Sequence, residues 1–342
     1  KKLYFKKTIL VTGAAGSIGS EIVRQLLNFN PKEIILFDNN ENSLFNIKKE
    51  LESNKSTTSF HYLLKSVTDL NSVEFCFSNF KIDVVFHAAA YKHVYMTENM
   101  PQATILNNIL GTKNVIDTAV HKKVSTFVFV STDKAVNPSN IMGATKRIAE
   151  MYVSVLSSEN KTKIITTRFG NVLGSNGSVV PIFQNQIAKG GPITVTHPKV
   201  TRFFMTIIEA CQLVLEAGAT GNHGEIYVFD MGKPVKIIDL AINMIRLSGL
   251  IENEDIEIKF SGLNRGEKLY EELLTDQENL KKSHNKLIFI AEKQKINVAI
   301  KTKILQLIKD ASNSKNTNYL VSSIKKIVPE FKSTNPNYKI LK

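Results

Sequence analysis

The stretch TILVTGAAGSIG, residues Thr8–Gly19, decides the fold of this 342-residue chain. An apolar run passes directly into three glycines (Gly13, Gly16 and Gly19), after which residues 17–28 have the apolar spacing of a helix. Glycines at these places permit a tight turn, close approach of the backbone to a pyrophosphate, and close packing of helix against strand. The N–H groups that open the helix favour an anion. The stretch therefore predicts a dinucleotide-binding turn, with a plain strand-to-helix turn as the alternative.

The same alternation of strand and helix continues through the first half of the chain. Helical spacing recurs at 42–51 and 103–120. Five further runs are apolar on both faces, as buried parallel strands are. They are Glu33–Phe37, Ser59–Leu63, Asp83–His87, Thr126–Ser131 and Lys163–Phe169. Repeated strand, crossover helix and strand predict an α/β fold, a Rossmann-like, doubly wound parallel sheet with right-handed crossovers.

The pattern changes after about residue 175, where shorter elements of mixed type follow. They are expected at Pro181–Lys189, Ile193–Thr196, Ile207–Ala217, Glu225–Phe229 and Lys236–Leu247. We therefore divide the chain into a dinucleotide-binding domain at 1–175 and a part at 176–342 that is mainly a smaller substrate-binding lobe. This second part ends in a polar tail, rich in Lys and Asn, from about Lys281.

The composition argues against several classes of protein. Only two cysteines, Cys76 and Cys211, are present, which favours a reducing compartment, and no apolar run has the length of a membrane span. The net charge of +13 comes from basic residues scattered along the chain, so we interpret it as a solvated surface and expect no nucleic-acid partner. Arginine is scarce, which makes Arg168 and Arg202 candidates for phosphate recognition, with structural ion pairs as the alternative.

A carboxylate at the end of the second strand predicts which dinucleotide binds. Asp38 follows Gly19 by 19 residues, where it would accept hydrogen bonds from the adenosine ribose hydroxyls and repel a 2′-phosphate. NAD is therefore favoured over NADP. Asp69, after the third strand, has two interpretations that stay open at this point: an acceptor for the adenine amino group, or the N-cap of a helix.

A polar segment, STDKAVNPSNIMGATK at 131–146, follows the fifth strand. Open α/β sheets place their chemistry at the carboxyl ends of strands. The candidate catalytic residues there are Thr132, Asp133 and Lys134. A helix is predicted to begin near Ser139 or Asn140, which places Met142 and Lys146 four residues apart on one helical face.

This arrangement resembles the extended branch of the short-chain dehydrogenase/reductase superfamily, in which a Tyr usually stands where this chain has Met142. The resemblance extends over most of the chain, through the segments HAAAYKH (87–93), NILGT (108–112), RFGNVLGS (168–175), THP (196–198) and GEKLYEE (266–272). Together they resemble the UDP-N-acetylglucosamine 4,6-dehydratases of bacterial polysaccharide synthesis and protein glycosylation. The Met variant resembles the configuration-retaining branch, which makes the precursor of bacillosamine and related 6-deoxy amino sugars.

In that branch the catalytic domain usually follows a membrane-spanning region. The chain begins with Lys1 rather than Met. We therefore expect the cytoplasmic catalytic part of a longer inner-membrane protein, with no membrane contact of its own.

The resemblance implies a hydro-lyase reaction with a recycled NAD. First a hydride leaves C4 of the hexose, and the resulting 4-ketone acidifies the C5 proton. Loss of that proton and of the C6 hydroxyl then gives an enone. Finally the hydride returns to C6. Lys134 can remove the C5 proton only when neutral, and we expect burial, Lys146 and the nicotinamide ring to lower its pKa. Asp133 would protonate the leaving hydroxyl if desolvation raises its pKa.

Without a tyrosine at position 142, another group must take the proton of the C4 hydroxyl. Our first hypothesis is Asp133, acting first as base and later as acid, and the alternative is a relay through Thr132 or water. Thr132 is expected to hold the C4 oxygen and Lys146 to bond the nicotinamide ribose. Three other functions are weighed: a C5-inverting dehydratase, a sugar 4-epimerase, and a non-catalytic NAD-binding protein in which Met142 is apolar packing.

The remaining site residues are expected from their positions in the motifs. The cofactor contacts are Gly13, Gly16, Ser17, Ile18, Gly19, Asp38, Asp69, Ala88, Ala89, Ala90, Asn108 and Lys146. The UDP-N-acetylglucosamine contacts are Lys92, His93, Asn171, Ser175, His197, Arg202 and Arg265. No metal is expected. Two positions depart from the family pattern: Asn264 stands where an Arg is common, and Tyr95 where a Pro is common. By analogy, the helices at 103–120 and 141–158 predict a homo-oligomer.

Overall fold

The computed structural model describes residues 3–53, 56–272, 280–291 and 297–341. Within these residues, the central sheet has nine strands in the order β14-β15-β11-β6-β5-β4-β1-β2-β3. The parallel strands are β1 (Thr8–Thr12), β2 (Glu33–Asp38), β3 (Ser59–Leu64), β4 (Val84–His87), β5 (Thr126–Val130), β6 (Lys163–Arg168) and β11 (Ile226–Phe229). β15 (Ile288–Ala291) and β14 (Leu280–Lys282) extend the β11 side of the sheet with antiparallel pairing.

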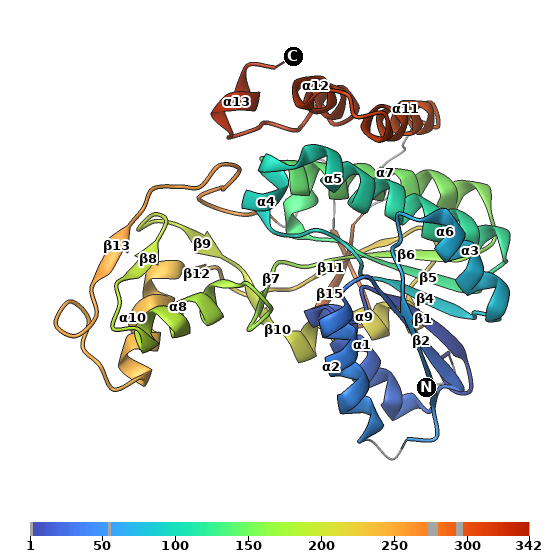
Figure 1. Cartoon of the computed structure of the whole chain (residues 1–342), viewed down its shortest axis with the longest axis horizontal. Coiled ribbons are helices and arrows are strands. Elements are labelled where there is room, and N and C mark those ends of the chain that lie inside the picture. Colours follow the sequence, from blue (N-terminus) through green and yellow to red (C-terminus); the bar gives the residue numbers. More distant parts are fainter. Residues whose placement is uncertain (1–2, 54–55, 273–279, 292–296, 342) are drawn as a thin grey trace.

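The Rossmann-like fold expected from the sequence is confirmed, and each of the first six strands lies within one residue of its predicted bounds. Helices cover both faces of the sheet (Figure 1). One apolar core lies under α1 (Ser17–Leu26), α2 (Glu41–Glu52) and α9 (Ile207–Thr220). The other lies under α3 (Leu70–Asn79), α6 (Gly111–His121) and α7 (Ile141–Glu159). Strands buried on both faces explain why their sequences are apolar throughout rather than alternating.

A smaller part of the chain extends to one side of the sheet (Figure 1). Its own core includes Phe183, Val195 and Ile245. The core is formed by α8 (Val179–Ala188), β8 (Ile193–Val195), α10 (Ile237–Leu247) and β13 (Ile258–Phe260). Two short pairings, of β9 (Thr201–Arg202) with β12 (Val235–Lys236) and of β7 (Asn171–Leu173) with β10 (Phe204–Thr206), lie between this core and the sheet. The domain boundary at residue 175 stays a prediction, and the structure adds that α9, β11, β14 and β15 lie with the large sheet.

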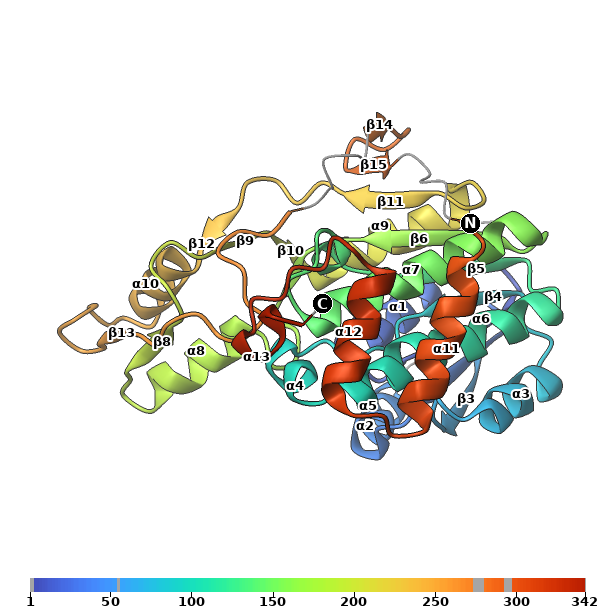
Figure 2. The same cartoon turned by 90° about the horizontal axis from the view of Figure 1, so that it is seen from above.

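The C-terminal helices lie across α5 (Pro101–Ile105) and α7, as Figure 2 shows. α11 (Ile300–Ser312) and α12 (Thr317–Ile327) contribute Ile304, Leu307, Leu320 and Ile324 to the core beneath α7. The predicted homo-oligomer was based on the helices at 103–120 and 141–158, and α11 and α12 pack against parts of both. No helix of the described residues is long and apolar enough to cross a membrane.

A buried carboxylate fastens the chain end to the start of α7. Glu98, in α4 (Val94–Asn99), accepts a hydrogen bond from the Ile141 backbone N–H at 2.7 Å through one oxygen. Its other oxygen accepts from Asn335 Nδ2 at 2.7 Å, and Tyr338, in α13 (Pro336–Lys339), donates to the Glu98 carbonyl at 2.9 Å. The first turn of the helix that bears Met142 is therefore held by the C-terminal segment.

Asn335→Ala should destabilise the protein, because it leaves one oxygen of the buried Glu98 carboxylate without its donor. We expect a loss of about 1–3 kcal/mol in the free energy of unfolding, measured by urea denaturation. Asn337→Ala, two residues away on the exposed surface, is the matched control and should change stability by less than about 0.5 kcal/mol. Equal effects of the two changes would show that the contact with Glu98 does not fasten the chain end.

Candidate active site

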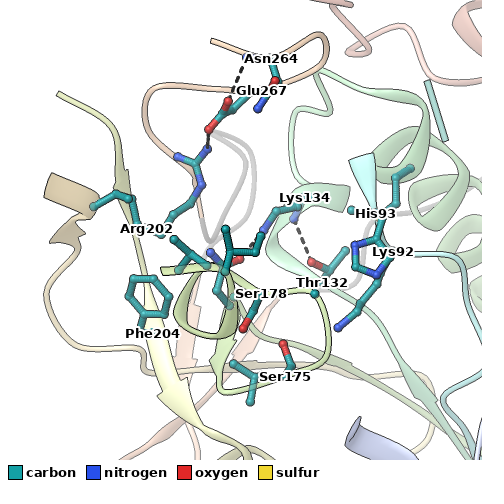
Figure 3. A pocket seen from close by; sticks show the side chains of 18 of the residues that line it. Lys92, His93, Thr132, Lys134, Ser175, Ser178, Arg202, Phe204, Asn264 and Glu267 are labelled. Carbon is teal, nitrogen blue, oxygen red and sulfur yellow. Dashed lines mark hydrogen bonds and ion pairs between the residues drawn. The ribbon is translucent and has the colours of Figure 1, made fainter. Parts of the chain in front are cut away.

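Two adjoining cavities lie at the carboxyl ends of the parallel strands. The first, of about 620 Å³, lies between the ends of β5 and β6 and the smaller part of the chain (Figure 3). The second, of about 520 Å³, lies over the glycine turn after β1. Six residues line both cavities: Ile18, Ala88, Ala90, Tyr91, Lys92 and His93. Cavities of this size suit small ligands, and their shared wall would bring two ligands into contact.

The glycine turn has no room for side chains at two places. Gly13 has φ +66°, and a Cβ there would lie 2.7 Å from the Ala89 backbone nitrogen. A Cβ on Gly19 would lie 2.0 Å from the Gly13 carbonyl oxygen. Asp38 holds the turn by accepting a hydrogen bond from the Ala15 N–H at 2.9 Å, and it lines the second cavity. The sequence therefore folds into a tight turn whose backbone lines the second cavity.

Most of the residues predicted to contact the cofactor surround the second cavity. They are Gly13, Gly16, Ser17, Ile18, Gly19, Asp38, Ala88, Ala89 and Ala90. Asp69 is not in this wall and instead caps α3, accepting from the Asn71 N–H at 3.2 Å and from the Ser72 hydroxyl. The N-cap interpretation is thus the one that the structure favours.

Asn108 is also absent from the cavity wall. It is 1 % exposed, and its amide bonds the backbone of Tyr91 and the hydroxyl of Thr145. The preceding residue, Asn107, lines the second cavity instead. Both lie in a π-helical turn, Leu106–Leu110, between α5 and α6. Such a turn changes which side of the helix each residue faces, so the ordinary helical period does not identify the exposed amide.

The catalytic candidates form a chain of polar contacts after β5. Thr132 Oγ1 donates to Asp133 Oδ1 at 2.8 Å, and Lys134 Nζ donates to the same oxygen at 3.0 Å. Lys134 also donates to Asn171 Oδ1 at 2.8 Å. Thr132 and Lys134 line the first cavity, whereas Asp133 is 1 % exposed and lies behind them. Asp133 is therefore connected to the cavity through hydrogen bonds from Thr132 and Lys134. This arrangement fits the alternative in which Thr132 relays the C4 hydroxyl proton.

The protonation of Lys134 differs from expectation. Burial lowers the pKa of its amine, but the negative charges of Asp133 and Glu271 outweigh burial, so the net direction is upward. The predicted lowering is wrong, because sequence reasoning missed Glu271. Its carboxylate lies 4.0 Å from Lys134 Nζ, with a side chain only 4 % exposed. The signal was present in the GEKLYEE segment, but that segment lies over 130 residues from Lys134.

Met142 and Lys146 lie on α7 as predicted, and both line the first cavity. Asn140 caps the helix by accepting from the Gly143 N–H at 2.8 Å. Lys146 Nζ donates to the Val130 carbonyl at 2.7 Å and lies 4.0 Å from the centre of the Phe129 ring. Burial lowers the pKa of Lys146 to about 7, although the charge of Glu150 opposes this.

The two arginines proposed for phosphate recognition have different surroundings. Arg168 is 1 % exposed and binds both oxygens of Glu150, at 2.8 and 2.6 Å, so the structural ion pair is the correct alternative. Arg202 lines the first cavity and pairs with Glu267 at 3.0 Å (Figure 3). Of the two, only Arg202 is placed to meet a ligand in this cavity.

The other predicted substrate contacts divide similarly. Lys92, His93, Asn171 and Ser175 line the first cavity. His197 and Arg265 are not part of its wall, whereas their neighbours Thr196 and Asn264 are, and both of these bond Glu267. Asn264, at a position where the family pattern differs, thus replaces Arg265 at the cavity. Among the described residues, no group of three or more His, Cys, Asp or Glu side chains is placed to hold a metal ion.

Comparison with known proteins agrees with this geometry. The family described as "Polysaccharide biosynthesis protein" matches residues 9–293. The chain belongs to this family. It is 53% identical over 310 residues to the capsular polysaccharide biosynthesis protein CapD of Staphylococcus aureus, covering 90% of this chain and 51% of CapD. It is 53% identical over 273 residues to the probable polysaccharide biosynthesis protein EpsC of Bacillus subtilis, covering 80% of this chain and 46% of EpsC. The chain thus spans about half the length of these two relatives.

Other relatives match along most of their length. A UDP-glucose 4-epimerase of Rickettsia rickettsii is 34% identical over 286 residues, covering 82% of this chain and 81% of the relative. Among solved structures, Pen from Bacillus thuringiensis is 36% identical with a TM-score of 0.78, covering 84% of this chain and 90% of Pen. The dTDP-glucose 4,6-dehydratase DesIV of Streptomyces venezuelae, solved with NAD, has 21% identity and a TM-score of 0.65, covering 74% of this chain and 84% of DesIV. At that identity DesIV supports the fold alone.

The position of Arg168 predicts a large stability effect for its partner. Glu150→Ala removes a buried carboxylate that Arg168, Arg147 and Ser131 all contact, at 2.6 to 3.4 Å. Because breaking a buried ion pair strands charge in the interior, we expect a loss of about 3–5 kcal/mol in urea denaturation. The control is Glu330→Ala, which removes a partly exposed partner of Arg147 and should cost less than about 1 kcal/mol. Similar losses from both changes would contradict a structural role centred on Glu150.

Proposed function

We propose that this chain catalyses the NAD-dependent 4,6-dehydration of UDP-N-acetylglucosamine. The product is UDP-2-acetamido-2,6-dideoxy-4-keto-hexose with the C5 configuration retained, a precursor of 6-deoxy amino sugars of the bacillosamine type. The observation that carries the proposal is that Thr132 and Lys134 line a cavity, together with Met142, and both bond the buried Asp133. Membership of a polysaccharide biosynthesis family supports a nucleotide sugar as the substrate.

The residues around the second cavity fit NAD. The glycine turn lets backbone approach a pyrophosphate, and the first turn of α1 presents its N–H groups to the same place. Asp38 supplies a carboxylate at the cavity wall for the ribose hydroxyls. When bound there, NAD would supply the hydride chemistry of the reaction, as the acceptor from C4 and the donor to C6. DesIV, of similar fold, was solved with NAD.

The side chains at the first cavity can move the protons that this reaction requires. Thr132 Oγ1 can take the C4 hydroxyl proton while it passes its own to Asp133 Oδ1, 2.8 Å away. The same proton is then available, through Thr132, to the C6 hydroxyl as it leaves. Neutral Lys134 removes the proton from C5. If Lys134 returns a proton to the same face of the sugar, the C5 configuration is retained.

The rest of the cavity suits the nucleotide. Arg202 offers a planar guanidinium for the diphosphate, and Lys92 at the wall shared with the second cavity offers another cation. Asn171 and Ser175 offer hydrogen bonds to the sugar or the diphosphate. We further propose that the chain works in the cytoplasm, within a homo-oligomer, as the catalytic part of a longer protein.

A 4-epimerase is the second candidate, because several relatives carry the name UDP-glucose 4-epimerase. Epimerisation at C4 needs no base for C5 and no acid for C6. A lysine and a carboxylate in contact beside Thr132 therefore favour dehydration. An epimerase would also normally rely on the tyrosine that Met142 replaces.

The deciding experiment is to incubate the protein with UDP-N-acetylglucosamine in D₂O and follow the products by NMR. We expect a 4-keto-6-deoxy sugar with the gluco-type configuration and deuterium at C5. An inverted C5 would overturn the retaining assignment, and UDP-N-acetylgalactosamine would establish the epimerase. Unchanged substrate with NAD bound would contradict turnover of this nucleotide sugar.

Two substitutions test the assigned roles. Asp133→Asn and Lys134→Ala should each lower kcat by about 100-fold or more, since each removes a proton-transfer group, while NAD binding stays intact. NAD binding is measured by fluorescence titration. Lys199→Ala, at an exposed position, is the control and should keep wild-type kcat. Wild-type turnover in either site variant would refute its role.

A further inference from the structure

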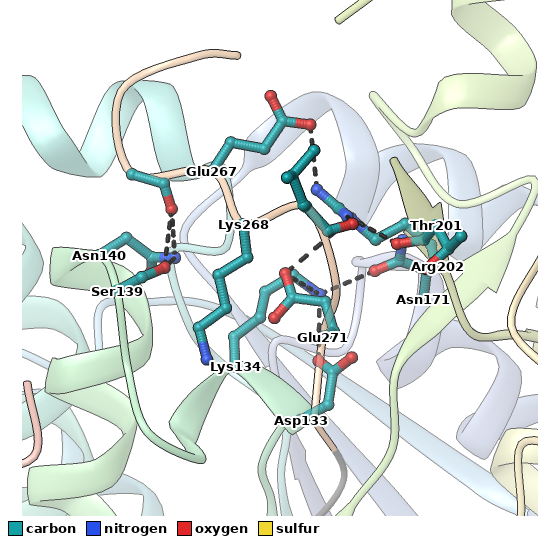
Figure 4. Close-up of polar contacts among 12 residues, drawn as sticks. Asp133, Lys134, Ser139, Asn140, Asn171, Thr201, Arg202, Glu267, Lys268 and Glu271 are labelled. Atoms are coloured by element: carbon teal, nitrogen blue, oxygen red, sulfur yellow. Dashed lines mark hydrogen bonds and ion pairs between the residues drawn. The ribbon is translucent and has the colours of Figure 1, made fainter. Parts of the chain in front are cut away.

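One carboxylate that the proposed reaction does not use lies between the two cations of the candidate site (Figure 4). Glu271 Oε1 is 4.0 Å from Lys134 Nζ and 3.9 Å from Arg202 Nε. The side chain of Glu271 is 4 % exposed and that of Arg202 is 9 % exposed. One oxygen atom therefore faces both the amine proposed as base and the guanidinium proposed to bind the diphosphate.

The surroundings of Glu271 favour its neutral, protonated form more than water favours that form of an ordinary carboxylate. The ionisable groups that act on it are Lys134, Asp133, Arg202 and Lys268. Burial is the largest influence and raises the pKa of Glu271; the charge of Asp133 raises it further, while the three cations oppose both effects. The net effect raises the pKa of Glu271, so this carboxylate takes up a proton more readily than an ordinary one.

Lys134, in contrast, is protonated, although the proposed reaction needs its neutral amine. Its ammonium group donates to Asp133 at 3.0 Å and to Asn171 at 2.8 Å, and both contacts favour the protonated amine. Removal of the C5 proton requires that this proton leave first. A bound nucleotide sugar would fill the cavity that Lys134 lines and exclude the water that could carry the proton away. Asp133 is the nearer carboxylate, but in the proposed reaction it takes the proton of the C4 hydroxyl through Thr132. A second proton acceptor inside the protein is therefore needed.

We propose that Glu271 accepts the ammonium proton of Lys134 when the substrate diphosphate binds Arg202. The proton moves from Lys134 Nζ to Glu271 Oε1, so an ammonium and a carboxylate become an amine and a carboxylic acid. The net charge of the site does not change. Glu271 acts through Lys134 and is a positioning residue, and this inference rests on the proposed function because it serves the base of that reaction.

Two effects of substrate binding drive the transfer. The substrate covers the pair, and the loss of water disfavours both charged forms. The diphosphate also competes for the guanidinium of Arg202, which weakens a cation that stabilises the Glu271 carboxylate. The 4.0 Å separation must close to a hydrogen-bond distance of about 2.7–2.9 Å, or one water must bridge it.

The kinetic test compares Glu271→Gln with Glu272→Gln. The second is the matched control, because Glu272 is exposed and contacts Lys268 and Asn137 outside the proposed chemistry. In the wild type the proton stays within the protein, so its transfer adds no pH dependence to kcat. In Glu271→Gln, Lys134 must lose its proton to solvent, so log kcat should gain a slope of about one per pH unit below the pKa of Lys134.

The slope of log kcat against pH is more informative than kcat at one pH. Removing the negative charge of Glu271 also makes Lys134 easier to deprotonate, which partly offsets the loss in kcat. We expect kcat near neutral pH to fall by about tenfold or more, with KM within about threefold of wild type. Glu271→Asp keeps a carboxylate and should restore the wild-type slope. A wild-type slope in Glu271→Gln would overturn the proposal.

A second measurement requires no turnover. Infrared difference spectra are recorded on binding of UDP-N-acetylglucosamine with NADH in place of NAD, so that no hydride can leave the sugar. They should show a new carbonyl band of a protonated carboxylic acid in the wild type and in Glu272→Gln, but not in Glu271→Gln. If the wild type fails to dehydrate UDP-N-acetylglucosamine while the band appears, the proposed function fails and the proton transfer stands. If the wild type dehydrates the substrate, but the band is absent and Glu271→Gln has the wild-type slope of log kcat against pH, the proposed proton transfer is refuted and the proposed function stands.

Discussion

The carboxylate of Glu150 is the contact on which the candidate site most depends. It lies on α7 and binds Ser131 at the end of β5 and Arg168 at the end of β6, at 2.6 to 2.8 Å. These three elements carry Lys146, the Thr132–Lys134 segment and the loop with Asn171. Buried charges of this kind cost desolvation and are retained where their hydrogen bonds are complete. Here the completed network fixes the relative positions of the groups that line the first cavity.

The sequence predicted the fold well because the relevant signals are local. A strand buried on both faces must be apolar throughout, and both interpretations of the glycine stretch, a dinucleotide-binding turn or a plain one, place it between a strand and a helix. The same is true of the residues at the ends of β1, β4 and β5, whose side chains or backbone meet at one edge of the sheet. Their identity as cavity residues follows from topology alone.

The wrong and missing assignments have non-local causes. A scarce arginine indicates a planar donor, but only the fold shows whether its partner is a ligand or, as for Arg168, the carboxylate of Glu150. Because of the π-helical turn at Leu106–Leu110, Asn107 lines the cavity instead of the predicted Asn108, and the periodicity of the sequence does not predict such a turn. Glu271 reaches Lys134 from a segment that follows the small β13, so its effect on the lysine pKa depends on how distant loops close over the site.

Met142 changes what the neighbouring lysine can do. A tyrosine at this place would have a hydroxyl near Lys146, and the cation would favour its ionised form. With a thioether instead, Lys146 donates to the Val130 carbonyl and packs against Phe129. The described residues around Met142 then offer another route for a hydroxyl proton, from Thr132 to Asp133, with Lys134 on the same oxygen. In the proposed reaction the tyrosine is therefore not required for proton transfer, and the charge state of the Asp133–Lys134–Glu271 group is the quantity that would control it.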